Sequence, residues 1–296
     1  MNIGFERSCN CPANHINCMN AKEWIQAQVA VWEFFYERRD IRDKNVHPAV
    51  FPIALAKRCI QLFTHEGELV VDPFVGSGTT LVAAMDTNRN AAGFDLKKEY
   101  VDLANERVSH AKMDSYLRAQ RKSPTAQVAV QADAHEIANY LKPETVSLSV
   151  TSPPYANMLN RRRLNKSIRG NLRRNEHYLK VQQYSADSRD LGTMEPEIYS
   201  KALGRIFKNL HPSLKPKAHC VINVTDIWWK DEKYGHRIPV HKYVMNEMEA
   251  AGYDLRNIII WDRRNLVNKV GIFGWPSNYI TLGTTFEYIL DFWKRP

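Results

Sequence analysis

The segment TSPPY, residues 151–155, places a hydroxyl, two prolines and an aromatic ring directly after the apolar run VSLSV. Each proline fixes its own φ at about −65° and keeps the residue before it extended, so the turn must be stiff. Because Pro153 and Pro154 have no N–H group, the turn offers hydrogen-bond acceptors and almost no donors. We therefore expect a group from outside the chain to donate to this turn, and we expect the ring of Tyr155 to be exposed.

A glycine-rich loop, DPFVGSGTT at residues 72–80, lies between the apolar run ELVV and the helical pattern LVAAMDT. Gly76 and Gly78 allow a sharp turn and a close approach to a ligand, and the N–H groups of the following helix can bind an anionic group. A mononucleotide loop would need a lysine that is missing here, and a dinucleotide loop would need GxGxxG. Both of these ligand classes are therefore disfavoured.

Two aspartates follow the next predicted strands. Asp95 ends the run NAAGF, where a carboxylate can accept both hydroxyls of a ribose. Asp133, in QADA, can accept a hydrogen bond from an adenine amino group. Each aspartate taken alone is equally well explained as a helix N-cap, but the series of strand-end carboxylates indicates an adenosine ligand.

Short apolar runs alternate with amphipathic segments along most of the chain, which predicts a parallel sheet with helices between its strands. We predict an α/β fold: a doubly wound, mostly parallel, seven-stranded Rossmann-like sheet whose last two strands, RNIIIW and TTFEYILDFW, form a hairpin. In such a sheet the ligand binds at the carboxyl ends of the strands. The segment AKEWIQAQVAVWEFFYERR predicts a helix over residues 21–38 with its aromatic rings in the core.

A long polar stretch interrupts this alternation from Tyr155 to about Asp190 and is rich in arginine and lysine. Structureless loops of this length are functional or disordered. A solvated surface loop is one explanation, but its position next to TSPPY favours contact with nucleic acid. The predicted DNA-contacting residues are Arg161, Arg162, Arg163, Lys166, Arg169, Arg173 and Arg174.

The 296 residues carry a net charge of +9, which favours a polyanionic partner. We find neither a leader pattern nor an apolar run long enough to span a membrane, so we predict a cytoplasmic protein. Cys9, Cys11 and Cys18, with His15 between them, could hold zinc. Their spacing lacks the paired knuckles of structural zinc sites, which favours a loosely ordered N-terminal arm, and we assign no metal site.

Together these motifs resemble the amino methyltransferases of DNA that use S-adenosyl-L-methionine, over about residues 47–294. The resemblance implies that DPFVGSGTT is the cofactor loop and that HPAVFP closes over the methionine end. It implies an N-terminal arm and helix (1–46), a cofactor-binding half (47–155), the basic insertion (156–195) and a second half (196–296). The implied cofactor-binding residues are His47, Pro48, Phe51, Asp72, Pro73, Phe74, Gly76, Ser77, Gly78, Thr79, Asp95 and Asp133.

TSPPY is similar to the catalytic segment of that family, which implies catalytic roles for Ser152, Pro153, Pro154 and Tyr155. An exocyclic amine is a poor nucleophile because its lone pair is delocalised into the base. Acceptors on Ser152 and Pro153 can hold its two hydrogens, while Tyr155 stacks on the flipped-out base. The cofactor loop precedes the catalytic segment, which resembles a permuted group and leaves sequence recognition to the insertion or the N-terminal helices.

The serine form of the catalytic segment accompanies N4-cytosine methylation, and the aspartate form accompanies N6-adenine methylation. The resemblance therefore predicts a site-specific cytosine-N4 methyltransferase of double-stranded DNA, in a restriction-modification system with a companion endonuclease. An N6-adenine DNA methyltransferase, an RNA base methyltransferase and a non-catalytic nucleic-acid-binding protein remain open. A cytosine-C5 enzyme is disfavoured, because the chain has no cysteine directly after a proline.

Overall fold

The computed structural model describes residues 3–12, 15–41, 51–117, 125–158, 187–230, 235–265 and 283–296. Eight of its strands form one sheet and two form a separate ribbon. The strands of the sheet are β1 Val31–Glu33, β2 Leu69–Asp72, β3 Asn90–Asp95, β4 Gln127–Gln131, β5 Val146–Thr151, β6 Leu214–Val224, β9 Tyr253–Asp262 and β10 Phe286–Lys294. The ribbon pairs β7 Ile227–Lys230 with β8 Gly235–Ile238.

The strand order of the sheet is β1-β9-β10-β6-β5-β2-β3-β4. Strand β10 is antiparallel to both of its neighbours, and the other pairs are parallel. The predicted α/β fold with a mostly parallel sheet is thus confirmed, as is the antiparallel pairing of the last two strands, although the sheet has eight strands and not seven.

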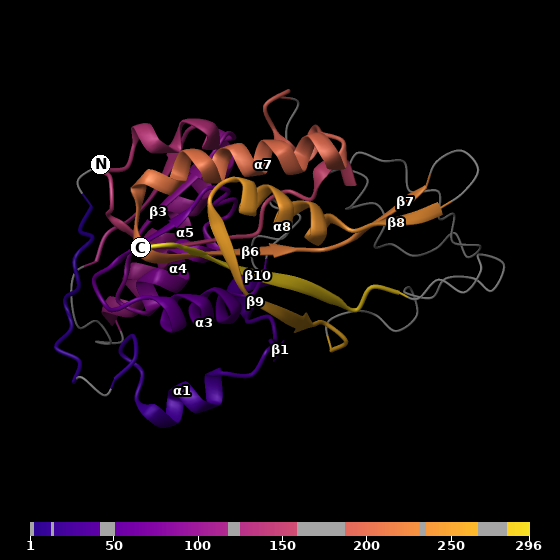
Figure 1. Ribbon diagram of the computed structural model, residues 1–296. Helices are drawn as coiled ribbons and strands as arrows, with labels where there is room; N and C mark the ends of the chain where they lie inside the picture. The colour runs from indigo at the N-terminus through magenta and orange to yellow at the C-terminus, as the bar shows by residue number, and fades with distance from the viewer. Residues whose placement is uncertain are drawn as a thin grey trace.

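Helices cover both faces of this sheet (Figure 1). Helices α7 and α8 pack on one face, and α3, α4 and α5 pack on the other. Successive residues of β2 point to opposite faces, so Val71 joins the first core and Val70 the second. The helices are α1 Ala21–Ala27, α2 Arg38–Ile41, α3 Ile53–Phe63, α4 Thr79–Asp86, α5 Lys98–Leu117, α7 Pro196–Leu210 and α8 Val240–Ala250. None of the helices in the described ranges is long and apolar enough to cross a membrane.

The strand order reverses between β2 and β5. From β2 the chain adds β3 and then β4 along one side, and it returns to place β5 on the other side of β2. All four strands are parallel, so their carboxyl ends meet at one edge of the sheet. This edge, beside the reversal, is where ligands bind in doubly wound sheets.

The helix predicted over residues 21–38 is wrong beyond Ala27, where α1 ends. Residues 31–33 form β1 instead, which pairs in parallel with β9. Trp32 is buried in this strand while Val31 and Glu33 are exposed, and such alternation fits a strand at the edge of a sheet. Valine and aromatic residues favour a pleated, half-buried surface, and pairing with β9 provides one.

Candidate active site

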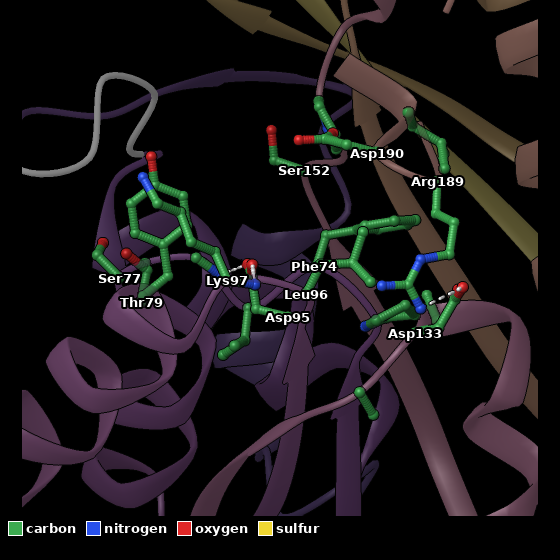
Figure 2. A pocket seen from close by; sticks show the side chains of 18 of the residues that line it. Phe74, Ser77, Thr79, Asp95, Leu96, Lys97, Asp133, Ser152, Arg189 and Asp190 are labelled. Carbon is green, nitrogen blue, oxygen red and sulfur yellow. Dashed lines mark hydrogen bonds and ion pairs between the residues drawn. The ribbon is translucent and has the colours of Figure 1, made fainter. Parts of the chain in front are cut away.

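A pocket opens at the carboxyl ends of β2, β3, β4 and β5 (Figure 2). It contains roughly 810 Å³ of empty space, which includes open solvent. Its walls come from the loops that follow the four strands and from residues 189–191. The predicted site residues among its lining are Phe51, Pro73, Phe74, Gly76, Ser77, Thr79, Asp95, Asp133, Ser152 and Pro154.

The glycine loop between β2 and α4 is sharply bent. Gly76 and Gly78 have φ angles of 46° and 86°, in the left-handed region that glycine adopts without strain. A Cβ atom on Gly78 would lie 2.9 Å from the backbone of Ala104 in α5, so only glycine allows this close packing. Gly78 itself does not line the pocket but sets the direction in which α4 begins.

Asp72 lies beneath the pocket and not in its wall. Its buried carboxylate accepts hydrogen bonds from the hydroxyls of Thr80 and Thr151, both at 2.6 Å, and from the N–H of Phe74 at 3.0 Å. Burial raises the pKa of Asp72 to about 6. Asp72 therefore ties the glycine loop to the end of β5 and positions the pocket wall without touching the cavity.

Asp95 ends β3 and lines the pocket, as predicted. Its carboxylate accepts the backbone N–H groups of Gly76 at 3.1 Å and Lys97 at 2.9 Å. Burial raises the pKa of Asp95 to about 6. Each carboxylate oxygen can accept more than one hydrogen bond, so both oxygens retain capacity for hydroxyl groups of a ligand.

Asp133 both caps a short helix and lines the pocket. Its side chain accepts the N–H of His135 at 2.9 Å at the start of the 3-10 helix Ala134–Asn139, as the N-cap explanation predicts. The Arg189 guanidinium lies 3.8 Å from the other carboxylate oxygen. Figure 2 shows this pair on one side of the pocket and Ser77 with Thr79 on the other.

The side chain of Tyr155 points into the protein. Only 9% of the residue is exposed, so the prediction of an exposed ring is wrong. The phenol donates to the Glu287 carboxylate at 2.8 Å and lies 3.1 Å from the Ser152 hydroxyl. Burial, followed by the charge of Glu287, raises the pKa of Tyr155, so the phenol keeps its proton. A buried carboxylate that needs donors explains why the ring turns inward.

Glu287 gathers further partners from neighbouring strands. The Asn223 amide of β6 donates to Glu287 at 2.6 Å and to the Tyr155 oxygen at 2.9 Å, and Arg263 pairs with the second oxygen of Glu287. Since the Tyr155 hydroxyl donates its proton to Glu287, the phenol oxygen can take part in further hydrogen bonds only as an acceptor. Its donors are then Asn223 and Ser152. The Ser152 proton is therefore directed into this network. The Ser152 oxygen accepts a long hydrogen bond from the Asn223 amide at 3.4 Å and retains acceptor capacity toward the pocket.

The sequence predictions missed part of this site. Glu287 and Asn223 lie 132 and 68 positions from Tyr155, and the only hint of a role was that Glu287 is an acidic residue in an apolar strand. Other pocket residues that were not predicted are Val75, Leu96, Lys97, Tyr100, Ala134, Arg189, Asp190 and Leu191. Outside the described residues lie the predicted cofactor residues His47 and Pro48 and the predicted DNA contacts Arg161, Arg162, Arg163, Lys166, Arg169, Arg173 and Arg174.

Residues 15–106 match the model of the N6/N4 methyltransferase family, described as DNA methylase. This segment, about a third of the chain, is similar to DNA methylase sequences. The chain is 41% identical over 78 residues to the type II methyltransferase M.HpaI of Haemophilus parainfluenzae, which covers 26% of this chain and 25% of the relative. It is 48% identical over 64 residues to the orphan methyltransferase M.BamHII of Bacillus amyloliquefaciens, which covers 22% of this chain and 24% of the relative. The matches thus span about a quarter of the length of these relatives.

Two solved structures show weaker likeness. A protein from Thermus thermophilus in complex with S-adenosyl-L-methionine has a TM-score of 0.36 and 23% identity, covering 56% of this chain and 52% of the other. A SAM-dependent methyltransferase from Methanosarcina mazei has a TM-score of 0.45 and 10% identity, covering 79% and 95%. Both scores are low, so neither likeness supports a statement about function.

Proposed function

We propose that this protein is a DNA methyltransferase that transfers a methyl group from S-adenosyl-L-methionine to the exocyclic amine of a flipped-out base. One observation carries the proposal: Ser152 of the SPPY segment lines the same pocket as the glycine loop and Asp95. These three features come from separate parts of the chain, and the strand order brings them to one edge of the sheet. The match of residues 15–106 to the DNA methylase model also supports it.

The residues present fit S-adenosyl-L-methionine. Asp95 can accept hydrogen bonds from the two ribose hydroxyls, and Asp133 can accept one from the adenine amine. Apolar surface for the rings comes from Phe51, Phe74 and Leu191. The carboxylates of the pocket also favour a ligand with a positive charge. When bound, S-adenosyl-L-methionine would supply an electrophilic methyl group on a sulfonium centre.

The chain would activate the amine by holding its hydrogens. The Ser152 oxygen and the Pro153 carbonyl accept the two N–H groups, which lets the nitrogen become pyramidal and directs its lone pair toward the methyl group. The network of Tyr155 and Glu287 keeps the Ser152 hydroxyl pointed inward, so this acceptor is already oriented before the base arrives. Acceptors fixed in this way need little reorganisation as positive charge develops on the nitrogen.

The proposed target is cytosine N4 in a short site of double-stranded DNA, because the segment has the serine form at position 152. N6-adenine would use the same two acceptors. The type II names of the similar methyltransferases support a place in a restriction-modification system, with protection of the site from a companion endonuclease. We assign DNA contact to the insertion at residues 156–195.

Incubation with S-adenosyl-L-methionine and mixed-sequence duplex DNA, followed by digestion to nucleosides and mass spectrometry, tests this function. We expect N4-methylcytosine, formed much more slowly by the Ser152→Ala variant, which retains the glycine loop and Asp95. N6-methyladenine would keep the mechanism and change the base. Methylation of RNA alone, or cofactor binding with no methyl transfer to any nucleic acid, would refute the proposal.

A further inference from the structure

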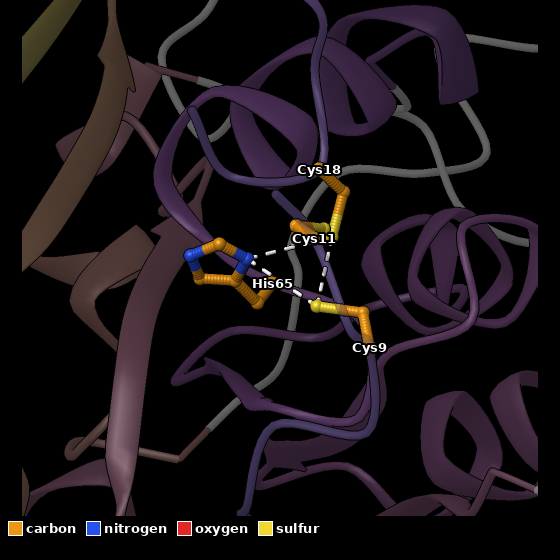
Figure 3. A group of neighbouring side chains, drawn as sticks. All are labelled: Cys9, Cys11, Cys18 and His65. Atoms are coloured by element: carbon orange, nitrogen blue, oxygen red, sulfur yellow. Dashed lines mark hydrogen bonds between the residues drawn. The ribbon is translucent and has the colours of Figure 1, made fainter. Parts of the chain in front are cut away.

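Four side chains that commonly bind metals, none of which lines the pocket, converge in one group (Figure 3). Cys9, Cys11 and Cys18 come from the N-terminal segment, and His65 comes from the turn between α3 and β2. One ligand atom from each, the three Sγ atoms and a ring nitrogen, lies within 4.8 Å of all the others. The sequence had suggested His15 as the fourth member of this group, but the structure places His65 there.

The two S···N distances within the group match the edges of a coordination tetrahedron, and one S···S distance is shorter than such an edge. Bonds of about 2.3 Å from Zn²⁺ to sulfur and about 2.0 Å to nitrogen require S···N edges of about 3.5 Å and S···S edges of about 3.8 Å. His65 Nδ1 lies 3.5 Å from both Cys9 Sγ and Cys18 Sγ, and these two sulfurs are 3.3 Å apart. A disulfide would need about 2.05 Å, and the ligands of an iron–sulfur cluster would be spread around its inorganic core. The spacing therefore suits one metal ion.

We propose that Cys9, Cys11, Cys18 and His65 bind one Zn²⁺ ion in a tetrahedral structural site. Three thiolates and one imidazole are the soft donors that select zinc over magnesium or calcium. All four positions of the tetrahedron are filled by the protein, which leaves no open position for a substrate and makes the site structural.

Neighbouring N–H groups already point at the sulfurs. Arg7 Nε donates to Cys9 Sγ at 3.0 Å, and the backbone N–H of Glu66 donates to Cys18 Sγ at 3.4 Å. Three thiolates exceed the charge of one Zn²⁺ ion, so the Arg7 guanidinium offsets the remaining negative charge. Donors of this kind orient metal ligands and stabilise bound thiolates.

The turn that presents Cys18 has an uncommon backbone. Asn17 and Cys18 both have positive φ angles, 48° and 69°, and Ile16 and Met19 exchange two hydrogen bonds across them at 3.0 and 2.8 Å. A positive φ is uncommon for a residue other than glycine and is retained where surrounding contacts require it. A bond from Cys18 to the metal would supply such a requirement.

The zinc would fasten the N-terminal segment to the turn before β2. Other contacts also cross this junction: Ser8 N–H donates to the Glu66 carbonyl at 2.7 Å, Lys215 Nζ donates to the Phe5 carbonyl at 3.1 Å, and Asn17 Nδ2 donates to the Leu62 carbonyl. His65 precedes β2, whereas the glycine loop follows it, so the zinc site and the pocket lie at opposite ends of this strand. The zinc therefore acts on the fold and takes no part in methyl transfer.

Elemental analysis of the full chain, purified without chelators from zinc-supplemented cells, tests the site. We expect about one zinc per chain, as for a single structural site. Cys11→Ser and His65→Ala should lose most of this zinc, whereas His15→Ala is the matched control and should keep it. A wild-type protein without zinc, or zinc retained in both Cys11→Ser and His65→Ala, would overturn the proposal. So would zinc lost from His15→Ala but kept by His65→Ala.

Two measurements on the wild-type chain do not depend on the folding of variants. Replacement of zinc by Co²⁺ should give the intense visible absorption bands of a tetrahedral site, together with thiolate-to-cobalt charge-transfer bands. A weak octahedral spectrum would refute the proposed tetrahedral site. Thiol titration of the freshly purified, chelated and denatured protein should find all five cysteines free. A Cys9–Cys18 disulfide would leave only three of the five thiols free. That result would also refute the site.

Hydrogen exchange separates this site from the proposed methyltransferase activity. Chelation should speed amide exchange in residues 3–20 and leave the amides of β2 and β5 protected. Methyl transfer can fail while zinc is bound, and zinc can be absent while methyl transfer proceeds, so the two proposals are tested independently.

Discussion

Tyr155→Phe distinguishes two roles for this side chain. The substitution keeps the ring, and with it any stacking on a base, but removes the hydroxyl that joins Ser152 to Glu287. If stacking were the whole role of Tyr155, the variant would retain full activity. If the hydroxyl orients Ser152, its loss in the variant frees the Ser152 proton to point into the pocket. There the proton would repel the hydrogens of the amine. We expect the second result.

The magnitude follows from the hydrogen bonds that are lost. The phenol makes one bond to a carboxylate, worth about 1.5–3 kcal/mol, and accepts two weaker ones from neutral groups, worth about 1 kcal/mol each. Glu287 keeps Asn223 and Arg263, so we expect the variant to lose about 2–4 kcal/mol of unfolding free energy, a fall of roughly 3–7 °C in Tm. The misdirected Ser152 hydroxyl should cost about 1–2 kcal/mol in the transition state, a decrease in kcat of about 5- to 30-fold.

A double-mutant cycle with Ser152→Ala provides the assay. Methylation rates and the affinity for S-adenosyl-L-methionine are measured for the two single variants and the double variant. If Tyr155 acts through Ser152, Tyr155→Phe should have little further effect on kcat in the Ser152→Ala background, while cofactor affinity stays unchanged throughout. Wild-type kcat in Tyr155→Phe, or equal losses in both backgrounds, would refute the positioning role.

Three further predictions follow from the pocket and the insertion. Asp95→Asn should weaken S-adenosyl-L-methionine about 10- to 100-fold by calorimetry, because an amide has one acceptor oxygen and cannot serve Gly76, Lys97 and a ribose together. Since burial raises the pKa of Asp95 to about 6, the wild-type affinity should also fall as pH drops below about 6, where the carboxyl is protonated and loses its charge; affinity independent of pH would remove Asp95 from the ribose role. Gly78→Ala should lower unfolding free energy by about 1–3 kcal/mol in denaturant titrations, because its φ of 86° and its contact at 2.9 Å with Ala104 both exclude a Cβ atom; an unchanged midpoint would contradict this packing. Replacement of Arg161, Arg162 and Arg163 by glutamine should weaken DNA binding on all sequences and reduce the salt slope by about 1 for each phosphate contact, whereas an unchanged slope would place the DNA contacts elsewhere.

The sequence by itself determined the local elements and the order of chemical groups along the chain. The helical pattern LVAAMDT predicted α4, which extends over Thr79–Asp86. The runs ELVV and NAAGF predicted β2 and β3, and the aspartate after β3 lines the pocket as expected. These signals are readable because side-chain periodicity depends only on neighbours in the sequence.

Tertiary structure alone decided which distant side chains meet. Tyr155 turned inward because Glu287 of β10 lies beside it, and the chain between them carries no signal for that pairing. The fourth member of the cysteine group is His65 and not the nearby His15, because the turn before β2 faces the N-terminal segment. Residues 31–33 became a strand because β9 offered an edge to pair with. Each of these outcomes depends on strand order and packing, which bring together residues too far apart for any local pattern to relate.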